Sequence, residues 1–442
     1  MMEPAEALQM LDPAFAQPVP AISRTGEKRR GKHEGARLAL AATLGTRLLV
    51  WAAAMATIAI FGENNVARHV LDPLGVTPAA HSGVLNGFLA PGARWDSVWY
   101  VLIASHGYFN PASTNFFPLY PVLVGLGDRL VDSPILVGIA ISVSSAVGAL
   151  MLLYRLALLD LDEPGARMTV LLVSLFPASL FLSAVYPTSL FLLLSVGAVY
   201  AARREQWAVA GLCGGLASAA RSNGILLAGV LALLYLYGPR GRAPMHQRAG
   251  AWWRPRFPIE RDIAWLALVP AGLLAYLGYL LVAHGAPLAP FHAAGTDWGH
   301  SFGGPFASVF NALGEVPADL RAVLGHTSTP IGPGDPISWQ TRDLIDVAFA
   351  AVAVAAVALA WRRVPRVYWI FAIVQFAQIT SFPTKTEPLI GLPRYLLPMF
   401  PLFMGAGAYL AERRTAARIT LAASAGLLVL FSALWGYWAL VP

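Results

Sequence analysis

The sequence predicts an all-α integral membrane protein, a multi-spanning helical bundle that crosses the bilayer about eleven times. Its composition is 57% hydrophobic and only 12% charged, whereas soluble domains carry roughly 25% charged residues. After residue 37, apolar runs of about 15 to 25 residues recur along most of the chain, and this length suits a helix that crosses hydrocarbon. These two observations exclude an ordinary soluble domain.

The amino-terminal region divides into a polar tail and a first membrane helix. Residues 1–36 mix prolines, charges and small residues, and a basic cluster precedes the first apolar run, so we expect a disordered cytoplasmic tail. Residues 37–62 are too long for a signal-peptide core and lack a clear cleavage site, which predicts a retained first span. We expect residues 37–442 to form a single polytopic transmembrane domain.

The apolar runs give the positions of the predicted spans. Four of them, between residues 168 and 238, are short and closely spaced, which is typical of half-crossing or tightly hairpinned helices. The predicted spans lie near residues 37–62, 134–158, 168–186, 188–202, 206–220, 222–238, 263–283, 344–361, 367–382, 394–411 and 416–438.

Basic residues predict the orientation of the chain. With a cytoplasmic amino terminus, most Lys and Arg residues fall in cytoplasmic segments, as the positive-inside rule requires. This distribution explains the net charge of +7, and with no nucleic-acid-binding motif we expect no nucleic-acid partner. Two long segments, 63–133 and 284–343, then lie outside. The preference for arginine over lysine favours a bacterial protein, and hence the bacterial plasma membrane.

The first outer segment contains an unusual stretch, RWDSVWYVLIASHGYFNPASTNFFPLYP, over residues 94–121. Its aromatic residues are typical of a helical segment that lies at the headgroup level, and an aromatic belt is one interpretation. Asp96, between two tryptophans, is harder to explain, because a carboxylate near hydrocarbon is costly without a partner or a task. Arg94 is a possible local partner, which would make the pair structural. Pro118 and Pro121 predict a bend that holds Asp96 over a cavity mouth.

Three motifs carry a resemblance to a known family. They are RWDSVWYVLIASHGY followed by FFPLYPVL, then YPTSLFLLLSVGAVYAARREQWAVAGLCGGLASAARSNGILL over 186–227, and GLPRYLLPMFPLF over 391–403. Together they resemble the PIG-V-like family, the GPI mannosyltransferase II relatives among membrane glycosyltransferases of the GT-C fold. The turn after Tyr186 departs from the pattern, because it lacks the acidic residue expected in many relatives.

The resemblance implies a multi-spanning enzyme that moves a hexose, most simply mannose, from a polyprenyl-phosphate carrier to an acceptor hydroxyl outside the membrane. In that family an acidic residue of the first outer loop serves as the base, and Asp96 matches its position. We also expect Arg94, Trp95 and Tyr120 of the same stretch to contact substrate. The acceptor class stays open among a glycolipid, a polysaccharide and a protein.

Elementary chemistry agrees with this assignment. Inverting glycosyl transfer needs a carboxylate that accepts the acceptor's proton, and aspartate is ionised at neutral pH. The leaving phosphate departs as an anion and needs positive charge, which the outer side supplies as Arg221 and Arg394, with Tyr395 beside the latter. Snorkelling and helix anchoring are the structural alternatives for these arginines.

Two further residues are secondary candidates for binding substrate. Lys385 is one, although it would equally pair with Glu387 in solvent, and His106 is the other, although interfacial histidines are often only hydrogen-bonded. We expect no cofactor and no metal, because His292, Asp297 and His300 of the second outer segment fit no standard zinc spacing.

Two other classes of protein remain as alternatives. A polyprenyl-linked glycan transporter or flippase would move the lipid-linked sugar without transferring it. Such a transporter is expected to place coupled charges near the bilayer midplane, and the sequence does not show them. A structural membrane subunit would depend on neither Asp96 nor Arg394.

Overall fold

The computed structural model describes residues 24–241, 255–332, 334–384 and 387–439. Within them the protein is helical and contains no strand, only an isolated bridge between Pro330 and Ser338. The prediction of a multi-pass helical membrane protein is confirmed. Five apolar helical segments are long enough to cross a membrane: Glu34–Phe61 of α1 (Arg24–Phe61), α6 (Pro134–Ala157), η6 with α11 (Arg261–Ala267 and Leu268–His284), α14 (Trp339–Ala360) and α18 (Arg414–Gly436).

Shorter helices complete the bundle. As predicted, those between residues 188 and 237 are short and follow one another closely. The shorter helices of the bundle are α7 (Glu163–Leu175), η4 (Pro177–Leu182), α8 (Thr188–Arg203), α9 (Trp207–Ala220), η5 with α10 (Ser222–Leu226 and Leu227–Tyr237), α15 (Arg366–Ile379), α16 (Leu392–Leu396) and α17 (Phe400–Ala411).

Prolines break two of the predicted spans. The region 168–186 is not one helix, because Phe176, which precedes Pro177, adopts an extended conformation and separates α7 from η4. The region 394–411 is likewise divided, since α16 ends at Leu396 and α17 begins only at Phe400, beyond Pro398. At the amino terminus α1 already begins at Arg24, so residues 24–36 are helical instead of disordered. The rest of the predicted tail, residues 1–23, lies outside the described residues.

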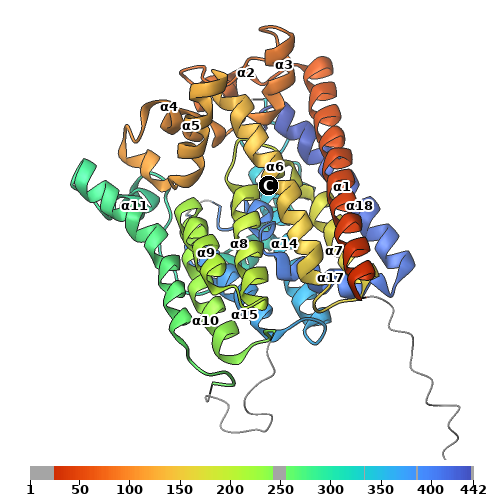
Figure 1. Cartoon of the computed structure of the whole chain (residues 1–442). Coiled ribbons are helices and arrows are strands. Elements are labelled where there is room, and N and C mark those ends of the chain that lie inside the picture. The colour runs from red at the N-terminus through yellow and green to blue at the C-terminus, as the bar shows by residue number, and fades with distance from the viewer. Residues whose placement is uncertain (1–23, 242–254, 333, 385–386, 440–442) are drawn as a thin grey trace, which may run out of the picture.

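Two long connecting segments, residues 63–133 and 284–343, are themselves helical. The first lies at the top of the bundle in Figure 1, as expected for an interfacial helical loop. The second meets it through Trp298, whose indole N–H donates to the carbonyl of Ala112 at 3.2 Å. Their helices are α2 (Asn65–Leu71), α3 (Val84–Leu89), η2 (Ala90–Gly92), α4 (Ser97–His106), η3 (Pro111–Asn115), α5 (Leu119–Val131), α12 (Ala289–Thr296) and α13 (Ala307–Leu324).

The opposite end of the bundle carries ion pairs between short turns. Arg203 at the end of α8 pairs with Asp160 at 2.6 Å, and Tyr368 of α15 joins them. Arg363 pairs with Glu412 at 2.6 Å. The residues with predicted chemistry lie at the other end of the bundle, beside the two connecting segments.

Helices α9 and α11 approach each other closely through glycines. A Cβ atom on Gly272 would lie 1.9 Å from the carbonyl oxygen of Gly215, so only glycine fits there. The hydroxyl of Ser218 also donates to the carbonyl of Val269 across this contact. This packing fixes α11 against the carboxyl-terminal half of α9, which shapes the surface described below.

Candidate active site

Asp96 lies at the amino-terminal end of α4, and its carboxylate is not used to cap the helix. Aspartate at this position usually accepts a hydrogen bond from a backbone N–H two or three residues on, but here no such bond forms. Instead Oδ2 accepts from the guanidinium of Arg394 at 2.5 Å. The two side chains are 27% and 20% exposed, so the pair is accessible at one side. No hydrogen bond to Oδ1 is formed by the described residues.

The backbone around Asp96 is held in an unusual conformation. Trp95 has a φ of 52°, in the left-handed region, which costs free energy for a residue with a side chain. The indole N–H of Trp95 donates to the carbonyl of Ala439 at 3.1 Å. The Asp96 backbone N–H donates to the hydroxyl of Tyr186 at 2.9 Å, and that hydroxyl donates to the carbonyl of Arg94 at 3.3 Å. Tyr186 therefore bridges the two peptide groups that flank Trp95.

A second arginine completes the charge arrangement. Arg394 donates to the hydroxyl of Tyr395 at 3.2 Å, and the guanidinium of Arg221 lies 5.0 Å from the centre of the Tyr395 ring. The guanidinium of Arg221 makes no hydrogen bond or ion pair with any residue that the structure describes, although Phe191 and Tyr395 both face its charge. One carboxylate and two guanidinium groups leave a net positive charge, which suits a phosphate.

The position of Arg221 follows from the local fold. The residue ends α9 in an extended conformation, at the turn between two short antiparallel helices. Burial lowers the pKa of Arg221, and the nearby charge of Arg394 lowers it further. Burial, and then the negative charge of Asp96, raises the pKa of Tyr186 well above its ordinary value, so Tyr186 stays neutral.

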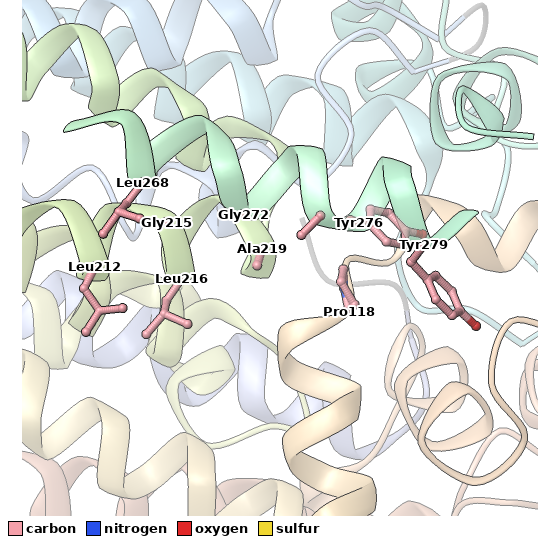
Figure 2. Close-up of a pocket in the computed structure, with 10 residues that line it drawn as sticks. Pro118, Leu212, Gly215, Leu216, Ala219, Leu268, Gly272, Tyr276 and Tyr279 are labelled. Carbon is pink, nitrogen blue, oxygen red and sulfur yellow. The ribbon is translucent and has the colours of Figure 1, made fainter. Parts of the chain in front are cut away.

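An apolar groove runs along α9 toward this site (Figure 2). It has a volume of about 390 Å³ and lies between α9 and α11. Leu212, Gly215, Leu216 and Ala219 form one face of α9 at helical spacing, and the end of that face lies within one turn of Arg221. Tyr276 and Tyr279 of α11, with Pro118, line the groove beyond Ala219, at the same end as Arg221.

Arg94 does not lie in the site as an exposed substrate contact. Its side chain is fully buried and pairs with Glu63 at 2.6 Å, while its guanidinium lies 4.8 Å from the centre of the Trp438 ring. Burial lowers the pKa of Arg94 to about 10, the nearby Glu63 opposes this, and the group stays protonated at neutral pH. The partner of Arg94 is therefore Glu63 and not Asp96, the local partner considered from the sequence.

Three other predicted contacts lie away from the charge pair. Tyr120 is fully buried, and its hydroxyl donates to the carbonyl of Gly138 at 2.9 Å, so it offers substrate no exposed surface in this structure. His106 is exposed at the far end of α4, roughly 15 Å along the helix from Asp96. Lys385 lies outside the described residues, and Glu387, its predicted alternative partner, pairs with Arg342.

The structure brings together four of the residues predicted from the sequence: Asp96, Arg221, Arg394 and Tyr395. Trp95 directly precedes Asp96, and its indole is held by a hydrogen bond to the carbonyl of Ala439. Sequence reasoning did not assign a role to Tyr186 or to Glu63. The only signal for Tyr186 was its place at the start of the second motif. Glu63 gave no signal, because it precedes its partner by 31 residues in an otherwise unremarkable turn.

The fold and this site define a multi-pass helical membrane protein with a carboxylate, two arginines and an adjacent apolar groove at one end of the bundle. The family model for mannosyltransferase (PIG-V) matches residues 42–238, which contain Asp96, Tyr186 and Arg221. This match confirms the resemblance to the PIG-V-like family. The motif at 391–403, with Arg394, lies beyond the matched residues.

Curated relatives that the chain resembles are also named as mannosyltransferases. The chain is 32% identical over 172 residues to GPI alpha-1,6-mannosyltransferase 2 of Mus musculus, covering 36% of this chain and 34% of the relative. It is 30% identical over 173 residues to the Homo sapiens protein of the same name, with 36% and 34% covered. GPI mannosyltransferase 2 of Yarrowia lipolytica is 34% identical over 143 residues, covering 32% and 40%. The chain thus spans only about a third of the length of the first of these relatives.

Proposed function

We propose that the protein is a membrane mannosyltransferase of the GT-C type, which transfers mannose from a polyprenyl-phosphate donor to an acceptor hydroxyl on the non-cytoplasmic face, with inversion at the sugar carbon. The observation that carries the proposal is the juxtaposition of a partly exposed carboxylate with two guanidinium groups, one of which has no hydrogen-bond or ion-pair partner among the described residues. The names of the relatives, which are mannosyltransferases, support mannose as the sugar.

In the proposed reaction Asp96 takes the proton from the acceptor hydroxyl through Oδ1, as that oxygen attacks the first carbon of the sugar. The bond from that carbon to the phosphate oxygen breaks, and the polyprenyl phosphate leaves with the electron pair. Arg394 and Arg221 bind the departing phosphate, so neither a general acid nor a metal is needed. Arg394 also holds the carboxylate of Asp96 in position through their ion pair.

The groove between α9 and α11 is the proposed site of the carrier's isoprenoid chain. Its lining is apolar, and it leads along α9 to within one turn of Arg221. A chain in this groove would stay in the bilayer while its phosphate reaches the arginines. Helix α9 is one of the predicted short spans between residues 168 and 238, whereas α11 lies outside them.

The acceptor is proposed as a hydroxyl of a glycolipid, a polysaccharide or a protein. The relatives are named for GPI, which favours a glycolipid. The bacterial plasma membrane and the cytoplasmic amino terminus remain part of the proposal, on the grounds of composition and of the distribution of Lys and Arg.

The test is transfer of radiolabelled mannose from polyprenyl-phosphate-mannose to a membrane lipid extract by the purified protein. Asp96→Asn should fold and bind donor but lose transfer by at least about 100-fold, since an amide cannot accept the proton. Asp297→Asn, at an exposed acid of the second connecting segment, is the matched control and should keep full activity. If Asp96→Asn still moves the lipid-linked sugar across vesicles and the wild type transfers none, the protein is a flippase and the proposal fails.

A further inference from the structure

Helices α13 and α14 meet at a cluster of three carboxylates, well separated in sequence from the charge pair of Asp96. Glu315 and Asp319 lie one turn apart on α13, and Asp343 lies in the second turn of α14. One oxygen from each of the three groups lies within 4.8 Å of the other two. Glu315 is exposed, whereas Asp319 and Asp343 are only 9% and 7% exposed.

The two buried carboxylates are not paired. Neither Asp319 nor Asp343 makes a hydrogen bond or an ion pair with a residue in the described parts of the chain. The nearest described cation, Arg342, is already engaged by Glu387 and lies 3.9 Å from Asp346. Burial raises the pKa of Asp319, and burial together with the charge of Asp319 raises the pKa of Glu315. Unpaired carboxylates at this depth are costly without a positive counter-charge.

We propose that Glu315, Asp319 and Asp343 bind one divalent cation of the hard class, Ca²⁺, Mg²⁺ or Mn²⁺. Carboxylate oxygens are the ligands that these ions prefer, at about 2.0 to 2.6 Å. Two oxygens on one such ion stand no more than about 5 Å apart, so the spacing of the three groups allows a shared ion. Water would supply the remaining ligands on the exposed side, next to Glu315.

Such an ion would fasten α13 to the bundle. Two like charges one turn apart destabilise a helix, and Pro317 between them removes one helical hydrogen bond. A bound cation would attract all three carboxylates and so connect α13 to α14. Its role would be structural, since it lies outside the proposed transfer reaction, and the inference does not depend on the proposed function.

The experiment uses the purified full chain in detergent, stripped with a chelator, and measures thermal unfolding with added Ca²⁺, Mg²⁺ or Mn²⁺. At least one ion should raise the melting temperature of the wild type by about 2 °C or more at saturation. Asp319→Asn and Asp343→Asn should lose this rise, yet unfold no earlier than the metal-free wild type, because each removes an unpaired charge. Asp297→Asn should respond as the wild type does. Direct titration with Mn²⁺, followed by electron paramagnetic resonance, should find one tight site, weakened at least about tenfold by Asp343→Asn.

Two outcomes would overturn the inference. One is a melting temperature that none of the three ions changes, as expected if protons or Lys385 neutralise the cluster. The other is a cation-induced rise that survives unchanged in both variants, which would place the ion elsewhere. Because the readouts are melting and binding, a protein without transferase activity would still test the site.

Discussion

The hydroxyl of Tyr186 is predicted to position the proposed base without touching substrate. It accepts from the backbone N–H of Asp96 at 2.9 Å and donates to the carbonyl of Arg94 at 3.3 Å, on either side of the left-handed Trp95. The substitution Tyr186→Phe removes both bonds and keeps the ring, which packs against Tyr100, Phe181 and Trp435.

The size of the effect follows from burial. Tyr186 is 2% exposed, so water does not easily replace its hydroxyl as the acceptor for the Asp96 N–H. Leaving a buried donor unsatisfied costs about 1 to 3 kcal/mol. If the strained turn at Trp95 relaxes to recover that energy, Asp96 shifts from its position against Arg394. A cost of about 1 to 3 kcal/mol in the transition state corresponds to a loss of roughly fivefold to 150-fold in kcat.

The assay compares kcat, the KM for the polyprenyl-phosphate donor and the melting temperature for the wild type and Tyr186→Phe. A positioning role predicts a lower kcat with a nearly unchanged donor KM, because the two arginines remain in place. Tyr154→Phe, at a buried tyrosine with no hydroxyl hydrogen bond in the described structure, is the control and should change neither. A Tyr186→Phe protein that melts early but turns over normally would refute the reasoning.

Two further predictions concern the buried ion pair and the groove. Arg94→Met should destabilise the protein by about 3 to 5 kcal/mol, because it leaves the buried Glu63 with only the longer contact to Arg68 at 3.8 Å, and Glu63→Gln in the same chain should recover part of the loss in a melting experiment. The exposed Arg129→Met is its control, and equal melting of the two variants would contradict the prediction. Leu216→Trp should fill the groove and raise the KM for long-chain donors at least about tenfold, while a short-chain analogue reacts nearly as before. Ile419→Trp, on an exposed part of α18, should change neither, and a Leu216→Trp protein with a wild-type KM would place the chain elsewhere.

The helical membrane architecture could be predicted from the sequence because hydrocarbon imposes a minimum length on each apolar run. The breaks inside two predicted spans were less visible. Pro177 and Pro398 each lie in an apolar stretch, and hydropathy alone does not register that they end a helix. The sequence signal was nonetheless present, since the residue before a proline avoids helical conformation.

The site was predicted in part, and the reason differs from residue to residue. Asp96 and Arg394 were found because charge near hydrocarbon needs an explanation, and 298 residues separate them in sequence, yet they form one pair. Arg94 drew the same attention for the same reason, but its charge is satisfied by Glu63 in the interior. Tyr120 was included for its aromatic neighbourhood, whereas its hydroxyl bonds inward to Gly138. A single sequence does not show which partner each polar group meets.

The short helices explain how a charged site forms at the end of an apolar bundle. Because α9 ends at Ala220 after 14 residues, it spans only about 21 Å, less than the thickness of the hydrocarbon. Arg221 follows directly on this short helix, and α4 and α16 bring Asp96 and Arg394 next to it. A carrier whose phosphate sits at the membrane surface would meet the arginines there without leaving the bilayer. Helices long enough to span would have placed Arg221 among water molecules, where its charge would be worth less to a leaving phosphate.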